Sequence, residues 1–240
     1  YRPEIDGLRA IAVISVIFYH ANVVIFDEKL FKGGFIGVDI FFVISGYLIT
    51  SLILRELNTT QSFSFMNFYE RRVRRILPPL FFVMLLCFPF AWVHLGPANF
   101  IDFSKSILYS LGFSSNFYFW DMGHQYAAAN SLLKPFLHTW SLSIEEQYYI
   151  IFPIFLFIIF RYLRNYLLLF LIVSFIFSLL LADWGSKNYP SATFYFLHSR
   201  AWELIVGSFL AFPKIYQHYK KNNLITQNLL SFIGFFIILF

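Results

Sequence analysis

The chain has 240 residues, of which 59% are hydrophobic, 22% are aromatic and only 13% are charged. A soluble domain of this size needs more charge to cover its surface, and the mean hydropathy of +0.66 indicates an integral membrane protein instead. The net charge of +5 is concentrated in short clusters, so no soluble basic domain is present to bind nucleic acid. Cys87 is the only cysteine, which excludes an intrachain disulfide and a cysteine metal site.

Apolar runs close to the length that crosses a bilayer, ~20 residues, recur along the whole chain. They predict spans over 8–26, 36–54, 76–94, 143–160, 166–182, 199–213 and 225–240. No alternation of the membrane-barrel kind is evident, so helices are the expected solution for satisfying the backbone in lipid. The predicted fold is all-α, a polytopic transmembrane helix bundle, and one membrane domain accounts for residues 1–240. Because the chain begins with Tyr1 and stops inside an apolar run, we expect a C-terminally truncated fragment of a longer domain.

Basic residues orient this bundle through the positive-inside rule. When Arg2 and Arg9 are cytoplasmic, the segments 27–35, 95–142 and 183–198 lie outside. The dense basic groups then all lie inside, namely Arg71–Arg75, Arg161 with Arg164, and Lys214 with Lys220 and Lys221. The segment 106–120 would reverse this order if it spanned, so we expect a re-entrant or interfacial element, or one laid on the outer face.

The first span carries two ionisable residues, Arg9 and His20, in the stretch EIDGLRAIAVISVIFYH. Eleven residues at about 100° each place both side chains on one helical face, ~16 Å apart along the axis. Intramembrane ionisable groups are costly and suggest function, so this face would line a path from the inside toward the outside. The alternative is a histidine bonded within the bundle and an arginine that snorkels to headgroups.

Four further stretches place polar groups near predicted helix ends. Asp39 lies near the outer end of the second span, as part of a site or as a helix-start acid. The small residues that follow it, such as Gly46, favour close helix packing. The cluster of Arg71, Arg72, Arg74 and Arg75 suits an anionic ligand or lipid headgroups, or serves as a topology signal alone.

The stretch HTWSLSIEEQYYIIFP predicts a helix start with Ser141 or Ser143 as the cap. A helix dipole explains one of the glutamates that follow, but Glu145, Glu146 and Gln147 together suggest a polar pocket. Farther on, Arg200 and Glu203 stand three residues apart at another outer helix start, where a local ion pair is the alternative to a site.

Under this single topology the polar residues separate into two groups. The outer half of the bundle receives His20, Asp39, His138, Glu145, Arg200 and Glu203, whereas the inner face receives Arg9 and the 71–75 cluster. The sequence therefore predicts an anion site inside and an acid–base site toward the outside. Periodicity does not distinguish a transporter from a transferase.

The same stretches resemble acyltransferase family 3, the bacterial membrane O-acyltransferases. They are YRPEIDGLRAIAVISVIFYH, GFIGVDIFFVISGYLIT, FYERRVRRILPPL, HTWSLSIEEQYYIIFP and RAWELIVGSFLA, in the family's order. The resemblance implies a domain of about ten spans in the bacterial inner (cytoplasmic) membrane, of which this chain holds about seven. It also implies transfer of an acyl group, usually acetyl, from cytoplasmic acyl-CoA to a hydroxyl of an envelope carbohydrate such as lipopolysaccharide O-antigen, peptidoglycan or exopolysaccharide.

The family's motifs fall on named positions of this chain. Its arginine–histidine motif falls on Arg9 and His20, and its paired arginines fall on Arg71 and Arg74, with Arg72 and Arg75 as a second register. Its tryptophan–serine–leucine motif and following glutamate fall on Trp140, Ser141, Leu142 and Glu145. Arg200 and Glu203 match more loosely.

The resemblance implies the following roles. We expect His20 to act as the base or acyl acceptor, with Asp39 or Glu145 holding the imidazole. Arg71 and Arg74 would bind the CoA phosphates, with Arg9 facing the pantetheine path. We assign acceptor binding to Trp140, Ser141, Arg200 and Glu203.

The scheme requires no metal and no cofactor beyond acetyl-CoA as donor substrate, and the histidines are too scattered to suggest a metal site. The expected partners are acyl-CoA, the carbohydrate acceptor and the bilayer. The sequence defines neither the oligomeric state nor the choice between acyl-histidine and direct transfer. A carrier that moves a polysaccharide or lipid precursor without acyl chemistry is the competing interpretation.

Overall fold

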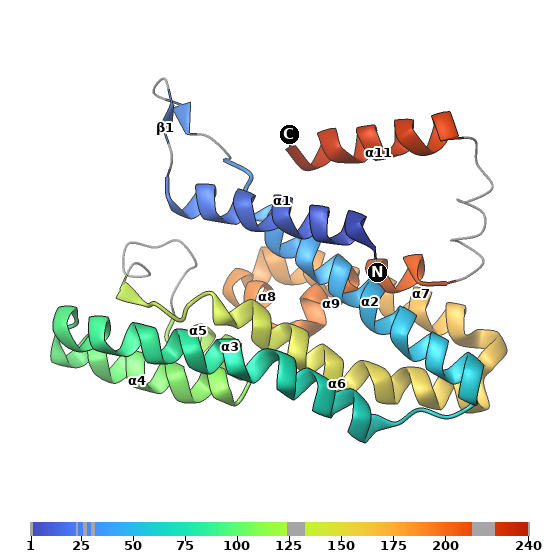
Figure 1. Cartoon of the computed structure of the whole chain (residues 1–240), viewed down its shortest axis with the longest axis horizontal. Coiled ribbons are helices and arrows are strands. Elements are labelled where there is room, and N and C mark those ends of the chain that lie inside the picture. Colours follow the sequence, from blue (N-terminus) through green and yellow to red (C-terminus); the bar gives the residue numbers. More distant parts are fainter. Residues whose placement is uncertain are drawn as a thin grey trace. The chain divides into compact units, whose positions relative to one another are not determined.

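The computed structural model describes residues 2–22, 24–25, 28–29, 32–123, 133–212 and 224–239, and these residues are almost entirely helical (Figure 1). The exception is a short antiparallel pair of strands, β1 (Val24–Ile25) and β2 (Glu28–Lys29), in which Val24 faces Lys29. The predicted all-α fold class is therefore confirmed. The predicted inner residues Lys214, Lys220 and Lys221 lie outside the described residues.

The helices follow one another with short connections. In chain order they are α1 (Pro3–His20), α2 (Ile36–Thr60), α3 (Phe65–His94), α4 (Pro97–Leu111), α5 (Ser115–Asp121), α6 (Thr139–Tyr162), the 3-10 turn η2 (Arg164–Tyr166), α7 (Leu167–Asn188), α8 (Pro190–Tyr195), α9 (Leu197–Leu210) and α11 (Leu224–Leu239).

Among the described residues, four helical segments are long and apolar enough to cross a membrane: α2, α3, α6, and η2 joined to α7. This finding makes the chain a multi-pass membrane protein, but it does not confirm the predicted number of about seven spans. The shorter helices explain the difference. α9 has only 14 residues, and α1 carries Glu4, Asp6 and Arg9 within its 18 residues.

The predicted start of the third span is wrong in an informative way. The predicted span 76–94 is only the second part of α3, which begins at Phe65 and includes the arginine cluster. Ser64 makes this early start possible, because its hydroxyl accepts a hydrogen bond from the Asn67 amide at 3.4 Å and caps the helix. The ambiguous segment 106–120 is divided between the end of α4 and α5.

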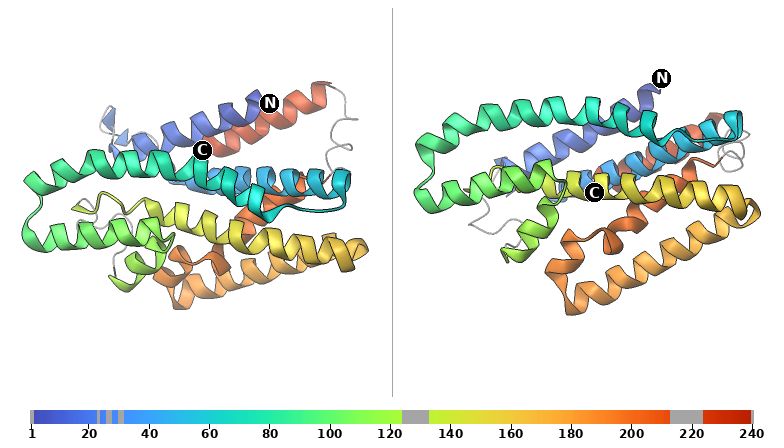
Figure 2. Two further views of the ribbon diagram at one scale, coloured as in Figure 1. Left: turned by 60° about the horizontal axis from the view of Figure 1, so that its bottom comes forward. Right: turned by 90° about the horizontal axis from the view of Figure 1, so that it is seen from below.

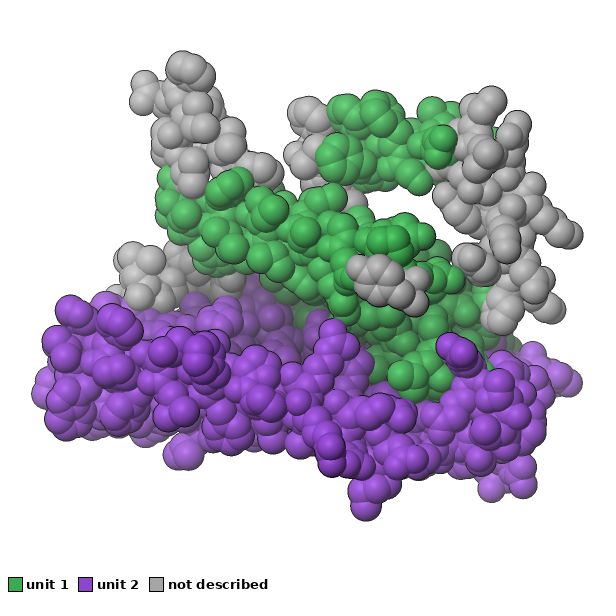
Figure 3. All heavy atoms as spheres, viewed as in Figure 1, with its two compact units in different colours: residues 1–54, 169–175, 201–240 green, residues 55–168, 176–200 purple. Residues whose placement is uncertain are grey.

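The chain forms two compact units, coloured separately in Figure 3. Unit 1 comprises residues 1–54, 169–175 and 201–240, and unit 2 comprises residues 55–168 and 176–200.

Close backbone contact between α2 and α9 organises unit 1. A Cβ atom on Gly46 would lie 1.8 Å from the Leu204 carbonyl oxygen, and one on Gly207 would lie 1.9 Å from the Val43 carbonyl oxygen. Thr50 then donates a hydrogen bond to the Ser208 hydroxyl at 2.8 Å. Small residues at such crossings allow two helices to approach closely. Close packing matters there because lipid tails are as apolar as the side chains, so the hydrophobic effect does not drive helices together. This confirms the packing role predicted for Gly46.

Unit 2 is built around α6, which contacts α4, α5 and α8. In both views of Figure 2, α4 meets α6 near one end of α6 instead of lying along it. Buried hydroxyl groups join α4 and α5 to the start of α6. Thr139 Oγ1 lies 2.8 Å from Ser110 Oγ and 2.9 Å from Ser115 Oγ, and Ser115 Oγ lies 2.8 Å from Ser143 Oγ. We call these four residues the hydroxyl network. Each hydroxyl both donates and accepts, so the network satisfies its members without water.

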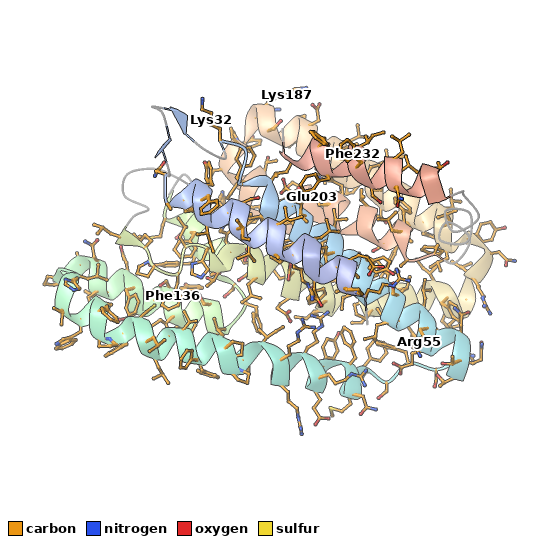
Figure 4. All side chains as sticks on the ribbon, turned by 45° about the horizontal axis from the view of Figure 1, so that its top comes forward. Lys32, Arg55, Phe136, Lys187, Glu203 and Phe232 are labelled. Atoms are coloured by element: carbon orange, nitrogen blue, oxygen red, sulfur yellow. The ribbon has the colours of Figure 1, made fainter. Side chains whose placement is uncertain are left out.

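An amide pair extends the same connection. Gln147 donates through Nε2 to Asn116 Oδ1 at 2.9 Å, and Asn116 donates to the Tyr195 carbonyl at 3.0 Å. Apolar packing completes the unit around Phe136, which is labelled in Figure 4, together with Leu80, Met84 and Phe103.

The helix crossing in unit 1 gives a stability prediction. Gly46→Ala places a methyl group against the Leu204 carbonyl, so we expect a loss of about 1–3 kcal/mol through overpacking. Gly234→Ala is the matched control, because no atom lies within 4 Å of its Cβ position in α11. It should be neutral or stabilising by up to about 1 kcal/mol. Thermal unfolding of the two purified variants in detergent tests this, and equal melting temperatures would refute the close contact.

Candidate functional site

α1 carries Arg9 and His20 on an amphipathic start followed by an apolar run. Pro3 begins the helix, and Glu4 and Asp6 lie in its first turn, where acidic groups favour the helix dipole. Arg9 Nη1 donates to Asp6 Oδ1 at 3.3 Å, and both side chains are partly exposed. This ion pair gives Arg9 a local acidic partner.

His20 is the last residue of α1 and is exposed. Its Nδ1 lies 2.8 Å from the Val16 carbonyl oxygen, and the Tyr19 ring packs edge-on at 5.2 Å between centroids. A carbonyl oxygen only accepts, so this contact places the hydrogen of a neutral imidazole on Nδ1. Nε2 then keeps its lone pair, which is the form that a base or an acyl acceptor needs. The imidazole ring is exposed and is not buried among the helices.

Asp39 lies in the first turn of α2, which packs against α1 within unit 1. Glycines allow this approach. A Cβ on Gly37 would lie 2.5 Å from the Ala12 carbonyl oxygen, and one on Gly34 would lie 2.8 Å from Tyr19 Cβ. Unit 1 therefore brings the beginning of α2, with Asp39, beside the half of α1 that ends at His20.

The arginine cluster projects from one continuous helix, so its members point in different directions. Arg71, Arg74 and Arg75 are exposed, and Arg74 pairs with Glu70 at 2.7 Å. Arg72 is partly buried, and its guanidinium carbon lies 3.8 Å from the centroid of the Tyr149 ring on α6. The residue that faces the interior of unit 2 thus belongs to the second register, not to the assigned pair Arg71 and Arg74.

The sequence carries a signal for this placement. Phe68, Leu80 and Met84 are buried at intervals of four residues or multiples of four, and Arg72 falls in the same series. Tyr69 fixes the crossing by donating its hydroxyl to the Ile150 carbonyl at 3.2 Å.

α6 begins at Thr139, two residues before Ser141, so the predicted cap at Ser141 or Ser143 is wrong. The cap position is His138, which makes no side-chain cap bond. Turn hydrogen bonds start the helix instead, because the Thr139 amide donates to the Phe136 carbonyl at 3.0 Å. Ser141 donates to the His138 carbonyl at 3.1 Å, and Ser143 belongs to the hydroxyl network.

The two glutamates of α6 differ in burial. Glu145 is partly exposed and accepts a long hydrogen bond of 3.5 Å from the Tyr149 hydroxyl. Glu146 is 8% exposed, and its Oε1 atom is buried without a hydrogen-bond partner among the described residues. The charged groups that act on it are Arg72 and Glu145. Sequence reasoning assigned a role to Glu145 and only a pocket position to Glu146.

Trp140 and Arg200 come together in unit 2. The Arg200 guanidinium lies 5.4 Å from the Trp140 ring centroid and 5.6 Å from that of Phe194, and Trp140 packs against Phe194 at 4.5 Å. Trp140 is 2% exposed, so its indole is an interior packing group that supports the arginine. Glu203, labelled in Figure 4, is buried on the part of α9 in unit 1.

Within the described residues no three histidine, cysteine, aspartate or glutamate side chains come close enough to hold a metal ion. The polar groups are instead arranged as single bases, cations and carboxylates on different helices. Such groups suit proton transfer and hydrogen bonding to an organic substrate.

Three known proteins are similar to this chain in sequence. A peptidoglycan O-acetyltransferase OatA of Listeria monocytogenes is 40% identical over 217 residues, which cover 88% of this chain and 34% of the relative. An O-acetyltransferase OatA of Staphylococcus aureus strain NCTC 8325 is 35% identical over 215 residues, with the same coverage. A putative O-acetyltransferase of Staphylococcus aureus strain MSSA476 is 42% identical over 156 residues, which cover 65% of this chain and 25% of the relative.

The chain spans about a third of the length of the OatA relatives it matches. No solved structure matches it. The model of acyltransferase family 3, described as an acyltransferase domain, matches residues 2–240. With that match over nearly its whole length, the chain belongs to acyltransferase family 3.

Proposed function

We propose that this chain is membrane machinery of an O-acyltransferase in the bacterial inner membrane. It takes an acetyl group from cytoplasmic acetyl-CoA and delivers it to a hydroxyl of a cell-envelope carbohydrate. Family membership supports the acyl chemistry, and the name of the Listeria relative favours peptidoglycan over lipopolysaccharide O-antigen as the acceptor.

One observation carries the proposal, namely the geometry of His20. The hydrogen bond from Nδ1 to the Val16 carbonyl leaves Nε2 as the basic nitrogen of an exposed ring at a helix end. A carrier needs no imidazole in this state, whereas acyl transfer needs a base or a nucleophile near neutral pH.

The chemistry follows from that nitrogen. In direct transfer, Nε2 takes the proton of the acceptor hydroxyl while the oxygen of that hydroxyl attacks the thioester carbonyl carbon. The carbon–sulfur bond then breaks, and the proton passes to the departing thiolate to give CoA thiol. In the two-step form, Nε2 attacks first and becomes acetylated, the thiolate leaves, and the acceptor hydroxyl then attacks the acetyl-imidazole.

Carboxylates and arginines complete the scheme. Asp39, whose helix start lies beside the end of α1, or alternatively Glu145 holds the imidazole and stabilises its cation. Arg71 and Arg74 bind the CoA phosphates from their exposed positions, and Arg9 faces the pantetheine path. Trp140, Ser141, Arg200 and Glu203 remain assigned to the acceptor.

Thioester consumption by the purified full-length protein in liposomes tests the function directly. With acetyl-CoA labelled in its acetyl group and a peptidoglycan fragment as acceptor, we expect label on the glycan and free CoA thiol in equal amounts. A carrier would consume no thioester, so an intact acetyl-CoA pool would refute the enzyme.

The role of His20 gives the next prediction. His20→Ala removes the basic nitrogen, and since base catalysis contributes about 10²–10⁴-fold, glycan acetylation should fall by that factor at normal membrane levels. His94→Ala is the control, because His94 is an exposed residue in the last turn of α3. Full acetylation by His20→Ala would show that the assignment is wrong.

The exposed arginines give a prediction about the donor. Arg71→Ala and Arg74→Ala should each raise the KM for acetyl-CoA about tenfold or more with little change in kcat, because each removes charge-assisted bonds to phosphate. Steady-state kinetics in liposomes measures both constants. Lys187→Ala removes an exposed cation that pairs with Asp183 on α7 and should leave KM unchanged. A KM that stays at the wild-type value in both arginine variants would contradict phosphate binding there.

A further inference from the structure

Arg72 and Glu146 lie in the interior of unit 2 and have no role in the scheme above. α3 and α6 cross so that Arg72 stacks on the Tyr149 ring at 3.8 Å, three residues along α6 from Glu146. The Phe68 ring lies on the same guanidinium at 5.8 Å. The Tyr149 ring therefore covers a flat face of the guanidinium, whose N–H groups are directed along its edge.

Glu146 has a buried oxygen that the described residues leave without a donor. The side chain is 8% exposed, and Oε1 is enclosed yet accepts no hydrogen bond. Buried polar atoms are normally satisfied, because an unsatisfied carboxylate oxygen costs more than a neutral group. An unsatisfied buried acceptor near a cation indicates that a donor from outside the chain completes the arrangement.

The local charge defines which ligand fits. Arg72 contributes one positive charge next to Glu146, and Glu145 is a second carboxyl group close to Glu146. Two neighbouring carboxyl groups disfavour a phosphate or another anion, in contrast to the exposed arginines Arg71 and Arg75. A neutral group with both an acceptor and a donor matches a guanidinium edge that donates and a carboxylate oxygen that accepts.

We propose that Arg72 and Glu146 form a binding site for a secondary amide. Arg72 donates to the amide oxygen, and Glu146 Oε1 accepts the amide N–H. This inference rests on the proposed function for the source of the amide, since both substrates carry one: the pantetheine arm of acetyl-CoA and the N-acetyl group of an amino sugar.

The site is tested with Glu146→Leu, Glu146→Gln and the control Asp183→Asn in the full-length protein. Asp183 is an exposed carboxylate on α7 that pairs with Lys187, so the control removes one negative charge away from the site. The donor arm compares acetyl-CoA with the acetyl thioester of butanethiol, which has no amide. The acceptor arm compares N-acetylated chito-oligosaccharides with cello-oligosaccharides, which differ by the N-acetyl group.

We expect Glu146→Leu to lower kcat/KM about ten- to a hundredfold for the amide-bearing substrate of one arm and not for its amide-free partner. Glu146→Gln keeps an acceptor oxygen, so its kcat/KM for the amide-bearing substrate should fall less than that of Glu146→Leu. The arm that responds identifies the source of the amide. Asp183→Asn should change neither ratio.

A stability measurement separates binding from a structural role. Replacing a buried carboxylate by a similar apolar side chain is often neutral or stabilising, so Glu146→Leu should melt at or above the wild-type temperature. If Glu146→Leu does not accumulate in the membrane, Glu146→Gln at normal levels decides through the same two ratios.

The outcomes also separate this site from the proposed function. Wild-type protein that consumes no thioester and acetylates no glycan refutes the function. Active wild-type protein whose Glu146 variants affect amide-bearing and amide-free substrates equally refutes the amide site and leaves the function intact.

Discussion

The constraint on which this structure depends is that lipid offers no partner to a polar group. Every hydroxyl, amide and charge inside the bundle has to be satisfied by another part of the chain or by a substrate. The hydroxyl network and the Asn116–Gln147 pair show the first solution, in which α4, α5 and α6 satisfy one another. Glu146 shows the second, because its buried oxygen has no protein partner among the described residues.

These two solutions separate structure from chemistry. Groups that are hydrogen-bonded within the chain hold helices together, and this is the role of Thr139 and Ser143. The Oε1 atom of Glu146, which has no hydrogen-bond partner among the described residues, is the group for which we propose a substrate as the partner. In the apolar surroundings of the bilayer, a polar atom without a hydrogen-bond partner costs free energy. Such an atom therefore persists only where function requires it.

Much of the fold could be predicted from the sequence, because apolar runs of sufficient length have few alternatives to a membrane helix. The residues at which the helices begin could not be predicted from the sequence. The polar first turns of α3 depend on the Ser64 cap, and the start of α6 depends on backbone turn bonds that leave no mark in residue type. The short helix α9 is apolar enough to resemble a span, yet its 14 residues are too few to cross a bilayer.

The positions of the candidate residues on their helices could be predicted, but their tertiary arrangement could not. The helical positions of His20 and Asp39 followed from spacing. Four arginines in five residues point to different sides of a helix, and although Arg72 shares the spacing of Phe68 and Leu80, only the structure shows it against the Tyr149 ring on α6. The serines of the 106–120 segment show a similar limit. Ser106 and Ser110 are spaced for one face, but their partner helix is set by tertiary contact.

The reciprocal glycines of α2 and α9 have a mechanical consequence. Two helices whose backbones touch at Gly46 and Gly207 can neither slide nor roll without atomic overlap, and the bond between Thr50 and Ser208 fixes their register. The beginning of α2, with Asp39, is therefore held by a helix from the far end of the chain. The packed pair of α2 and α9 is therefore rigid. Any motion that admits the donor and then the acceptor has to come from other elements.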